Sequence, residues 1–117
     1  MHKIIIADDS RKARTIIAEA VAAYKPNIEI CEVENGKEFV ERVGKERFDL
    51  AIIDHLMPIM TGLEAITEIR NLYSKEKLPI CMLTALDIKE EADRIFKKLA
   101  KKNPKQLMII DKKIAEI

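Results

Sequence analysis

Three aspartates follow directly after short aliphatic segments of the chain. Asp8 and Asp9 come after residues 3–7, and Asp54 comes after residues 50–53. If these segments meet, the carboxylates cannot all stay ionised without a cation, because like charges raise one another's pKa. A hard divalent ion such as Mg²⁺ prefers oxygen ligands and typically takes one or two carboxylates together with a substrate phosphate. The pattern therefore favours a metal-dependent phosphoryl site, at which a carboxylate attacks phosphorus and becomes an aspartyl phosphate.

Two further polar residues stand where later aliphatic segments end. Thr84 follows residues 80–83, and Asp111 and Lys112 follow residues 107–110. In phosphoryl transfer, hydroxyl and ammonium groups hold the phosphoryl oxygens while a metal neutralises the developing charge. We expect Thr84 and Lys112 to supply those two groups.

Predicted strands and helices alternate along the chain, which is an arrangement that can bring these residues together. The aliphatic segments predict strands, and apolar residues at helical spacing between them predict helices. The strands are expected at 3–7, 28–33, 50–53, 80–83 and 107–110, and the helices begin near Ser10, Asn35, Thr61 and Asp87. Such alternation predicts a parallel sheet with right-handed crossovers and helices on both faces. Open parallel sheets bind ligands beyond the carboxyl ends of their strands, which is where the polar residues stand.

Polar residues also predict where individual helices begin. Ser10 can cap the first helix, whose apolar residues keep helical spacing at Ala13, Ile16, Ile17, Ala20, Val21 and Tyr24. Asn35 with Glu38, and Thr61 with Glu64, have the three-residue spacing of a capping box, in which a helix N-cap residue and a glutamate bind each other's backbone N–H. A buried stripe is expected on the third helix at Leu63, Ile66, Ile69, Leu72 and Tyr73.

Composition limits the classes of function. The 117 residues are enough for one domain with a sizeable core, and 48% hydrophobic with 35% charged residues is typical of a globular protein. A net charge of +1 gives no footprint for direct nucleic-acid binding. No apolar run approaches the ~20 residues that span a bilayer, and Met1 leads straight into a strand, so we expect a cytoplasmic protein without a membrane partner. Cys31 and Cys81 lack metal-ligand spacing, which favours reduced core residues.

Taken together, these motifs identify a family. The pair Asp8-Asp9, the run D-H-L-M-P-I-M-T-G at 54–62, Thr84-Ala85 and a lysine after the last strand resemble the receiver domain of two-component response regulators. The resemblance covers roughly the first 112 residues, and the run at 54–62 is its most specific part. It implies a flavodoxin-like α/β fold with a five-stranded parallel sheet in the order 2-1-3-4-5. Residues 1–117 would then be a single receiver domain whose fifth helix is absent after about residue 114.

The resemblance also implies a role for each polar residue. Asp54 would accept a phosphoryl group from the phosphohistidine of a sensor histidine kinase or a phosphotransfer protein, and would thereby switch a surface that binds a downstream protein target. Asp9, Asp54 and the backbone carbonyl of Leu56 would bind Mg²⁺, with Asp8 acting through water. The phosphoryl group would then be contacted by Thr84 and Lys112.

The sequence departs from the family pattern near its C-terminal end. Lys112-Lys113 stands where the family has Lys-Pro, so either lysine could reach the phosphoryl group. Ile109 replaces an aromatic switch residue, and an aliphatic side chain has no hydroxyl to exchange partners. A missing fifth helix would leave apolar sheet surface uncovered beside the first helix. Truncation, a partner that covers the surface, or a homodimer would each explain it, and we expect the isolated chain to self-associate.

Apolar residues at two further positions predict a slow reset. Leu56 and Leu86 lie two residues beyond Asp54 and Thr84, and neither can orient a water molecule toward the phosphoryl group. We therefore expect a long-lived phosphoryl state. His55, directly after the acceptor, is expected to be a partly exposed spectator, and the lysines between 97 and 105 a solvated face.

Two other interpretations of the chain remain. In the first, a degenerate receiver acts as a phosphorylation-independent interaction or dimerisation module. In the second, the chain is an aspartate-nucleophile phosphohydrolase, but such enzymes place a second aspartate where Leu56 stands, so turnover has no evident general acid. We therefore expect no enzyme activity beyond self-phosphorylation and slow autodephosphorylation.

Overall fold

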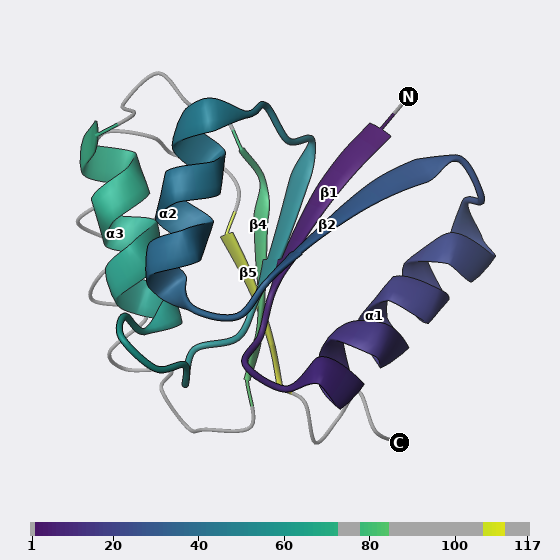
Figure 1. Ribbon diagram of the computed structural model, residues 1–117, viewed down its shortest axis with the longest axis horizontal. Helices are drawn as coiled ribbons and strands as arrows, with labels where there is room; N and C mark the ends of the chain where they lie inside the picture. The colour runs from purple at the N-terminus through teal and green to yellow at the C-terminus, as the bar shows by residue number, and fades with distance from the viewer. Residues whose placement is uncertain (1, 73–77, 85–106, 112–117) are drawn as a thin grey trace.

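The computed structural model describes residues 2–72, 78–84 and 107–111, which form a sheet and its helices (Figure 1). In chain order the elements are β1 (His2–Ala7), α1 (Arg11–Tyr24), β2 (Ile28–Val33), α2 (Gly36–Lys45), β3 (Leu50–Ile53), α3 (Gly62–Leu72), β4 (Ile80–Thr84) and β5 (Leu107–Asp111). The helix predicted from Asp87 and the lysines between 97 and 105 lie outside the described residues. None of the helices among the described residues is long and apolar enough to cross a membrane.

All strands of the sheet run parallel, in the order β2-β1-β3-β4-β5. The order of β2, β1, β3 and β4 confirms the doubly wound α/β fold predicted from the sequence, and β5 pairs with β4. Ala7 at the end of β1 pairs with Ile53 at the end of β3, and Ile53 in turn pairs with Met82 of β4. Because of this register, Asp8 and Asp54 leave adjacent strands at the same edge of the sheet.

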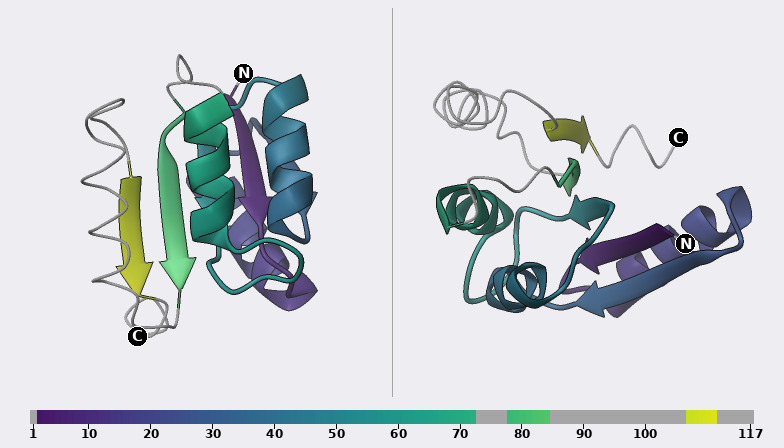
Figure 2. Two further views of the ribbon diagram at one scale, coloured as in Figure 1. Left: turned by 90° about the vertical axis from the view of Figure 1, so that its left-hand side faces the viewer. Right: turned by 90° about the horizontal axis from the view of Figure 1, so that it is seen from above.

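One face of the sheet is covered by α2 and α3, which lie side by side (Figures 1 and 2). Apolar residues of both helices keep the three- and four-residue spacing that puts them on one side. They pack against inward residues of β1, β3 and β4 in a core that includes Ile5, Ala7, Phe39, Val40, Val43, Ile53, Leu63, Ile66, Ile69 and Met82. The predicted stripe of α3 is confirmed at Leu63, Ile66 and Ile69, each exposing 2% or less.

The opposite face of the sheet is partnered by α1 (Figure 2). Ser10 caps this helix as predicted, since its Oγ accepts a hydrogen bond from the Ala13 N–H at 3.2 Å. The buried residue of α1, however, is a charged one, Arg14. Two of its large apolar residues are exposed, Ile16 by 57% and Tyr24 by 89%. The apolar spacing thus predicted the helix correctly, while the helix buries little of its apolar surface.

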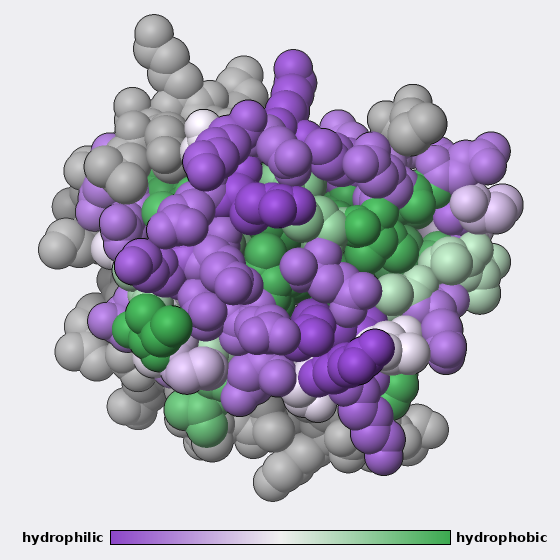
Figure 3. All heavy atoms as spheres, in the orientation of Figure 1, coloured by the Kyte–Doolittle hydropathy of each residue, from purple (hydrophilic) through white to green (hydrophobic). Residues whose placement is uncertain are grey.

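An apolar cavity of about 440 Å³ lies between α1 and the starts of β1, β2 and β3. Its walls include Ile4, Val21, Tyr24, Ile28 and Leu50. Figure 3 shows hydrophobic atoms at the surface between α1 and the strands, on a face that is otherwise largely hydrophilic. This region contrasts with the closed packing under α2 and α3.

Both cysteines are free thiols, as predicted. Cys31 is buried on β2, and its Sγ accepts a hydrogen bond from Nη2 of Arg42 at 2.9 Å. Cys81 is only partly buried, and desolvation raises the pKa of its thiol.

Candidate functional site

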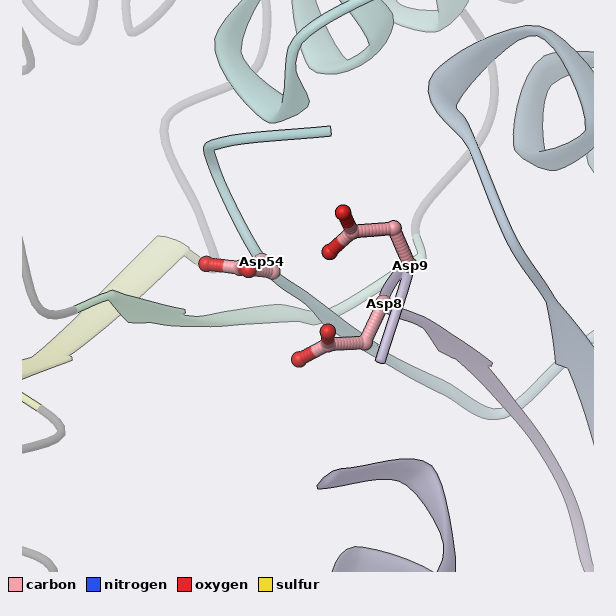
Figure 4. A group of neighbouring side chains, drawn as sticks. All are labelled: Asp8, Asp9 and Asp54. Carbon is pink, nitrogen blue, oxygen red and sulfur yellow. The ribbon is translucent and has the colours of Figure 1, made fainter. Parts of the chain in front are cut away.

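The carboxylates of Asp8, Asp9 and Asp54 meet at the carboxyl edge of the sheet, as the sequence predicted. Each offers one oxygen that lies within 4.8 Å of the others. In Figure 4 the side chains of Asp8 and Asp9 both extend from the end of β1 toward the side on which Asp54 lies. The Asp54 N–H donates to the Ala7 carbonyl at 2.9 Å, so the β1–β3 pairing continues up to the acid itself.

The three acids differ in burial and in their hydrogen bonds. Asp8 is 1% exposed, and its Oδ1 accepts a hydrogen bond from the Ser10 N–H at 2.9 Å. Asp54 is partly buried, and its Oδ1 accepts from the His55 N–H at 2.8 Å. Asp9 is exposed. The site therefore has a buried acid at its base and two more accessible acids beside it.

The donor set fits a hard divalent cation. Mg²⁺ binds oxygen atoms at about 2.1 Å in an octahedron, so ligand atoms on opposite sides of one ion are about 4.2 Å apart. The oxygens of the three acids lie within 4.8 Å of one another, so small side-chain rotations would bring them to that span. Carboxylate oxygens are the ligands that Mg²⁺ prefers, and nitrogen or sulfur ligands are absent from this group.

Of the remaining predicted site residues, the structure describes Leu56 and the backbone of Thr84. Leu56 lies in the loop after β3, with a side chain that is 61% exposed. Thr84 is the last residue of β4, which neighbours β3, and its backbone therefore reaches the same edge as Asp54. Lys112 and Lys113 lie outside the described residues.

His55 was predicted to be a partly exposed spectator, and this prediction is wrong. The side chain is buried with 8% exposed, and its Nδ1 accepts a hydrogen bond from the Leu63 N–H at 3.4 Å. The His55 carbonyl also accepts from the Gly62 N–H at 2.8 Å. His55 therefore joins the end of β3 to the start of α3. A polar side chain a few residues before a helix start is the signal that could have indicated this, because the first N–H groups of a helix need acceptors.

The chain passes close to itself at the start of α3. A Cβ atom on Gly62 would collide with the carbonyl oxygen of Asp54, so only glycine fits there. Thr61 and Glu64 form the predicted capping box, because the Glu64 N–H donates to Thr61 Oγ1 at 3.2 Å and the Thr61 N–H donates to Glu64 Oε1 at 3.0 Å. Hydrogen bonds from the N–H and the side chain of Thr61 to the carboxylate lower the pKa of Glu64. The beginning of α3 is thus built around the backbone of Asp54.

Arg14 is a second residue that the sequence analysis missed. Its Nη1 donates to the backbone carbonyl of Asp8 at 2.7 Å, and its Nε donates to Oε1 of Glu32 at 3.1 Å. Asp8 lies in the loop after β1, whereas Glu32 lies on β2, 18 residues from Arg14 in the sequence. No local pattern could have indicated such a contact.

Comparisons with known proteins agree with this arrangement. The sequence profile described as the response regulator receiver domain matches residues 4–103. The chain is 41% identical over 69 residues to the two-component response regulator ORR42 of Oryza sativa subsp. japonica, which covers 58% of the chain and 51% of that protein. It is 34% identical over 93 residues to the transcriptional regulatory protein ResD of Bacillus subtilis, covering 80% of the chain and 36% of that protein.

A third relative has an enzymatic name. The chain is 35% identical over 98 residues to a protein-glutamate methylesterase/protein-glutamine glutaminase of Pyrococcus horikoshii, covering 83% of the chain and 25% of that protein. The chain thus spans about half the length of these curated relatives or less.

Solved structures share the fold. The chemotaxis protein CheY4 of Vibrio cholerae superposes with a TM-score of 0.76 at 27% identity, covering 96% of this chain and 87% of that one. The response regulator TrrA of Thermotoga maritima in complex with Mg²⁺-BeF superposes with a TM-score of 0.71 at 25% identity, covering 94% and 87%. Together with the profile match over residues 4–103, these likenesses show that the chain belongs to the response regulator receiver domain family of two-component signalling.

Proposed function

We propose that Asp54 of this receiver domain accepts a phosphoryl group from the phosphohistidine of a sensor histidine kinase or a phosphotransfer protein. The observation that supports this most is the convergence of Asp8, Asp9 and Asp54 within 4.8 Å at the carboxyl edge of the sheet. We assign Asp54 as the acceptor because β3 lies between β1, which the other two acids follow, and β4, which ends at Thr84. A phosphoryl group on Asp54 would sit between metal ligands on one side and a hydroxyl on the other.

We assign Mg²⁺ binding to the carboxylates of Asp9 and Asp54 and to the backbone carbonyl of Leu56, with Asp8 acting through water. Mg²⁺ bound there would neutralise the charge that develops on the phosphoryl oxygens. The chain holds the acids ready for this, because Ser10 anchors Asp8 and the His55 N–H anchors Asp54.

The transfer step uses the carboxylate of Asp54 as the nucleophile. The new bond joins a carboxylate oxygen of Asp54 to phosphorus, and the phosphorus–nitrogen bond of the phosphohistidine breaks. The donor imidazole leaves with the electron pair of that bond and takes up a proton. Asp54 attacks in its ionised form, so the chain itself needs no general base for this step.

Other residues would hold and protect the phosphoryl group. We assign its oxygens to the hydroxyl of Thr84 and the ammonium group of Lys112, with Lys113 as the alternative lysine. Leu56 and Leu86 offer no polar group that could orient an attacking water, which supports a long-lived phosphoryl state. A phosphoryl half-life of hours at neutral pH is the expected result, and a half-life of seconds would contradict it.

Phosphorylation would bias a two-state surface that binds a downstream protein target. We propose that residues 1–117 are a single cytoplasmic receiver domain, with no turnover beyond self-phosphorylation and slow autodephosphorylation. The methylesterase of Pyrococcus horikoshii is matched over only 25% of its length, so we do not assign its enzymatic activity to this chain. A phosphorylation-independent module is not favoured, because the acids of the phosphoryl site stand together.

Intact-mass spectrometry tests this function directly. The protein is incubated with Mg²⁺ and a small acyl phosphate, alongside the variants Asp54→Asn and Asp49→Asn and a metal-free sample. Asp49 is a matched control, because it is an exposed aspartate directly before Leu50, the first residue of β3, whereas Asp54 directly follows the last residue of that strand.

A gain of one phosphoryl group is expected in the wild type and in Asp49→Asn when Mg²⁺ is present. No gain is expected in Asp54→Asn or without metal. Phosphorylation that persists in Asp54→Asn, or a wild type that gains nothing, would overturn the proposal.

A further inference from the structure

Arg14 occupies an unusual position for a charged residue. It exposes 7% of its surface and is the buried residue of a helix whose apolar side chains are exposed or half-buried. A guanidinium in such a place is costly unless its N–H groups have partners. Its burial is therefore explained by what it binds.

The guanidinium of Arg14 joins two segments that are distant in the sequence. Nη1 donates to the backbone carbonyl of Asp8 at 2.7 Å, a short bond inside the protein. On the other side, Nε lies 3.1 Å from a carboxylate oxygen of Glu32 and Nη2 lies 3.8 Å from one of Glu34. Glu32 belongs to the outer strand β2, and Glu34 follows directly after it. Arg14 is thus fixed by the end of β2 and in turn fixes the loop after β1.

The carbonyl that Arg14 holds belongs to the peptide between Asp8 and Asp9. The orientation of this peptide sets the ψ angle of Asp8 and the φ angle of Asp9, and therefore the directions in which both side chains leave the backbone. Figure 4 shows these two side chains extending toward Asp54 from adjacent positions. A change in these two angles would alter the backbone from which both carboxylates project.

Asp8 is also held through its own amide and its side chain. The Asp8 N–H donates to the Val33 carbonyl at 3.2 Å, and the Asp8 carboxylate accepts from the Ser10 N–H at 2.9 Å. These bonds restrain the amide and the side chain, whereas the guanidinium binds the carbonyl of the following peptide. Arginine suits this role, because its planar guanidinium can donate hydrogen bonds to a carbonyl and to carboxylates in fixed directions. Lysine offers only a single flexible ammonium group.

From this geometry we infer that Arg14 is a positioning residue of the acid site. It aims the Asp8–Asp9 peptide so that both carboxylates face Asp54, and Glu32 and Glu34 hold it in place. The end of β2 thereby becomes part of the geometry that binds Mg²⁺, a consequence that rests on the proposed function. The inference assigns to Glu32 and Glu34 a role at the acid site that they play through Arg14.

The test compares two arginines of the same helix. Arg14→Lys keeps the charge and removes the planar guanidinium, and Arg11→Lys makes the same change at an exposed position in the first turn of α1. Proton–nitrogen correlation spectra of the metal-free proteins report the amide of Asp9, and calorimetric titration reports Mg²⁺ affinity. Both are measured well below the unfolding temperature of each variant, so that a loss of stability does not contribute.

We expect Arg14→Lys to shift the Asp9 amide resonance and to weaken Mg²⁺ binding about tenfold, in the range found when a residue that orients metal ligands is replaced. Arg11→Lys should leave both unchanged. A folded Arg14→Lys with wild-type spectra and affinity, or one that is only less stable to heat, would overturn the inference.

A second pair of variants covers the case in which Arg14→Lys does not fold. The double variant E32Q/E34Q should shift the Asp9 amide, whereas Glu29→Gln at the start of β2 should not. An unchanged Asp9 amide in E32Q/E34Q would also contradict the inference. A wild type that binds no Mg²⁺ would overturn the proposed function, while the metal-free spectra would still decide whether Arg14 positions the peptide.

Discussion

The two faces of the sheet are held by different means. Under α2 and α3 the inward side chains are mostly apolar and expose little or nothing, with Phe39 at 0% and Ile66 at 1%, although α3 also buries Arg70 at 5%. Across the sheet, α1 buries a guanidinium and leaves Ile16 and Tyr24 largely exposed. The packing of the first face contributes hydrophobic free energy to folding, whereas Arg14, the buried residue of α1, binds the loop that carries two acids. The closed apolar core and the arginine that binds the Asp8 loop thus lie on opposite faces, while the start of α3 also packs against the backbone of Asp54.

Replacing the same residue type on each face gives the largest expected contrast. Ile66→Ala removes a side chain that is 1% exposed in the core under α3, and should lower the free energy of unfolding by about 3 kcal/mol. Ile16→Ala on α1 removes a side chain that is 57% exposed, and should cost less than about 1 kcal/mol. Urea unfolding monitored by circular dichroism measures both. Equal losses would show that the two faces contribute alike.

Gly62 lies where the start of α3 meets the backbone of Asp54, and Gly44 of α2 serves as its control. Gly62→Ala places a Cβ against the carbonyl oxygen of Asp54, and should cost about 2 kcal/mol. It should also slow phosphorylation, because the displaced backbone carries the acceptor. Gly44→Ala, at an exposed position inside α2, should instead stabilise the protein by about 0.5 kcal/mol, because alanine favours a helix. Unfolding and intact-mass measurements check both, and a neutral Gly62→Ala would contradict the close approach.

Helix caps on the two faces should differ by a smaller amount. Asn35 is buried, and its Oδ1 accepts from the Glu38 N–H at 2.8 Å at the start of α2. Ser10 is exposed and accepts at 3.2 Å at the start of α1. We expect Asn35→Ala to cost about 1.5 kcal/mol and Ser10→Ala about 0.5 kcal/mol. Thermal unfolding of the two variants measures both losses. A larger loss of stability in Ser10→Ala than in Asn35→Ala would contradict the prediction.

The smallest expected effect is a pH dependence at the start of α3. The N–H and hydroxyl of Thr61 lower the pKa of Glu64 below its usual value of 4.5. The ionised form is therefore the one that stabilises the fold, so this contribution is complete above pH 4.5 and is lost as the pH falls through the lowered value. The difference in unfolding free energy between wild type and Glu64→Gln should be present at pH 7 and should shrink below pH 4. A difference that grows on acidification would contradict this sign.

Much of the fold and part of the site could be predicted because they depend on short-range patterns. Aliphatic segments became strands, and the Thr61–Glu64 capping box formed between residues three positions apart. The convergence of Asp8, Asp9 and Asp54 could also be predicted, because parallel strands put their carboxyl ends at one edge. The parts assigned to Thr84 and Lys112 in binding the phosphoryl group stay predictions.

The amino-acid sequence by itself determined the strands, the helix starts and the kinds of group at the sheet edge. Only the tertiary structure decided that His55 is buried against α3, that Tyr24 is exposed, and that Arg14 joins Asp8 to the end of β2. The reason is that hydrogen-bonded turns and caps are set by neighbours in the sequence. Burial and long-range partners, by contrast, depend on which surfaces the whole chain brings together, and the same helical spacing fits an apolar residue on either face of the sheet.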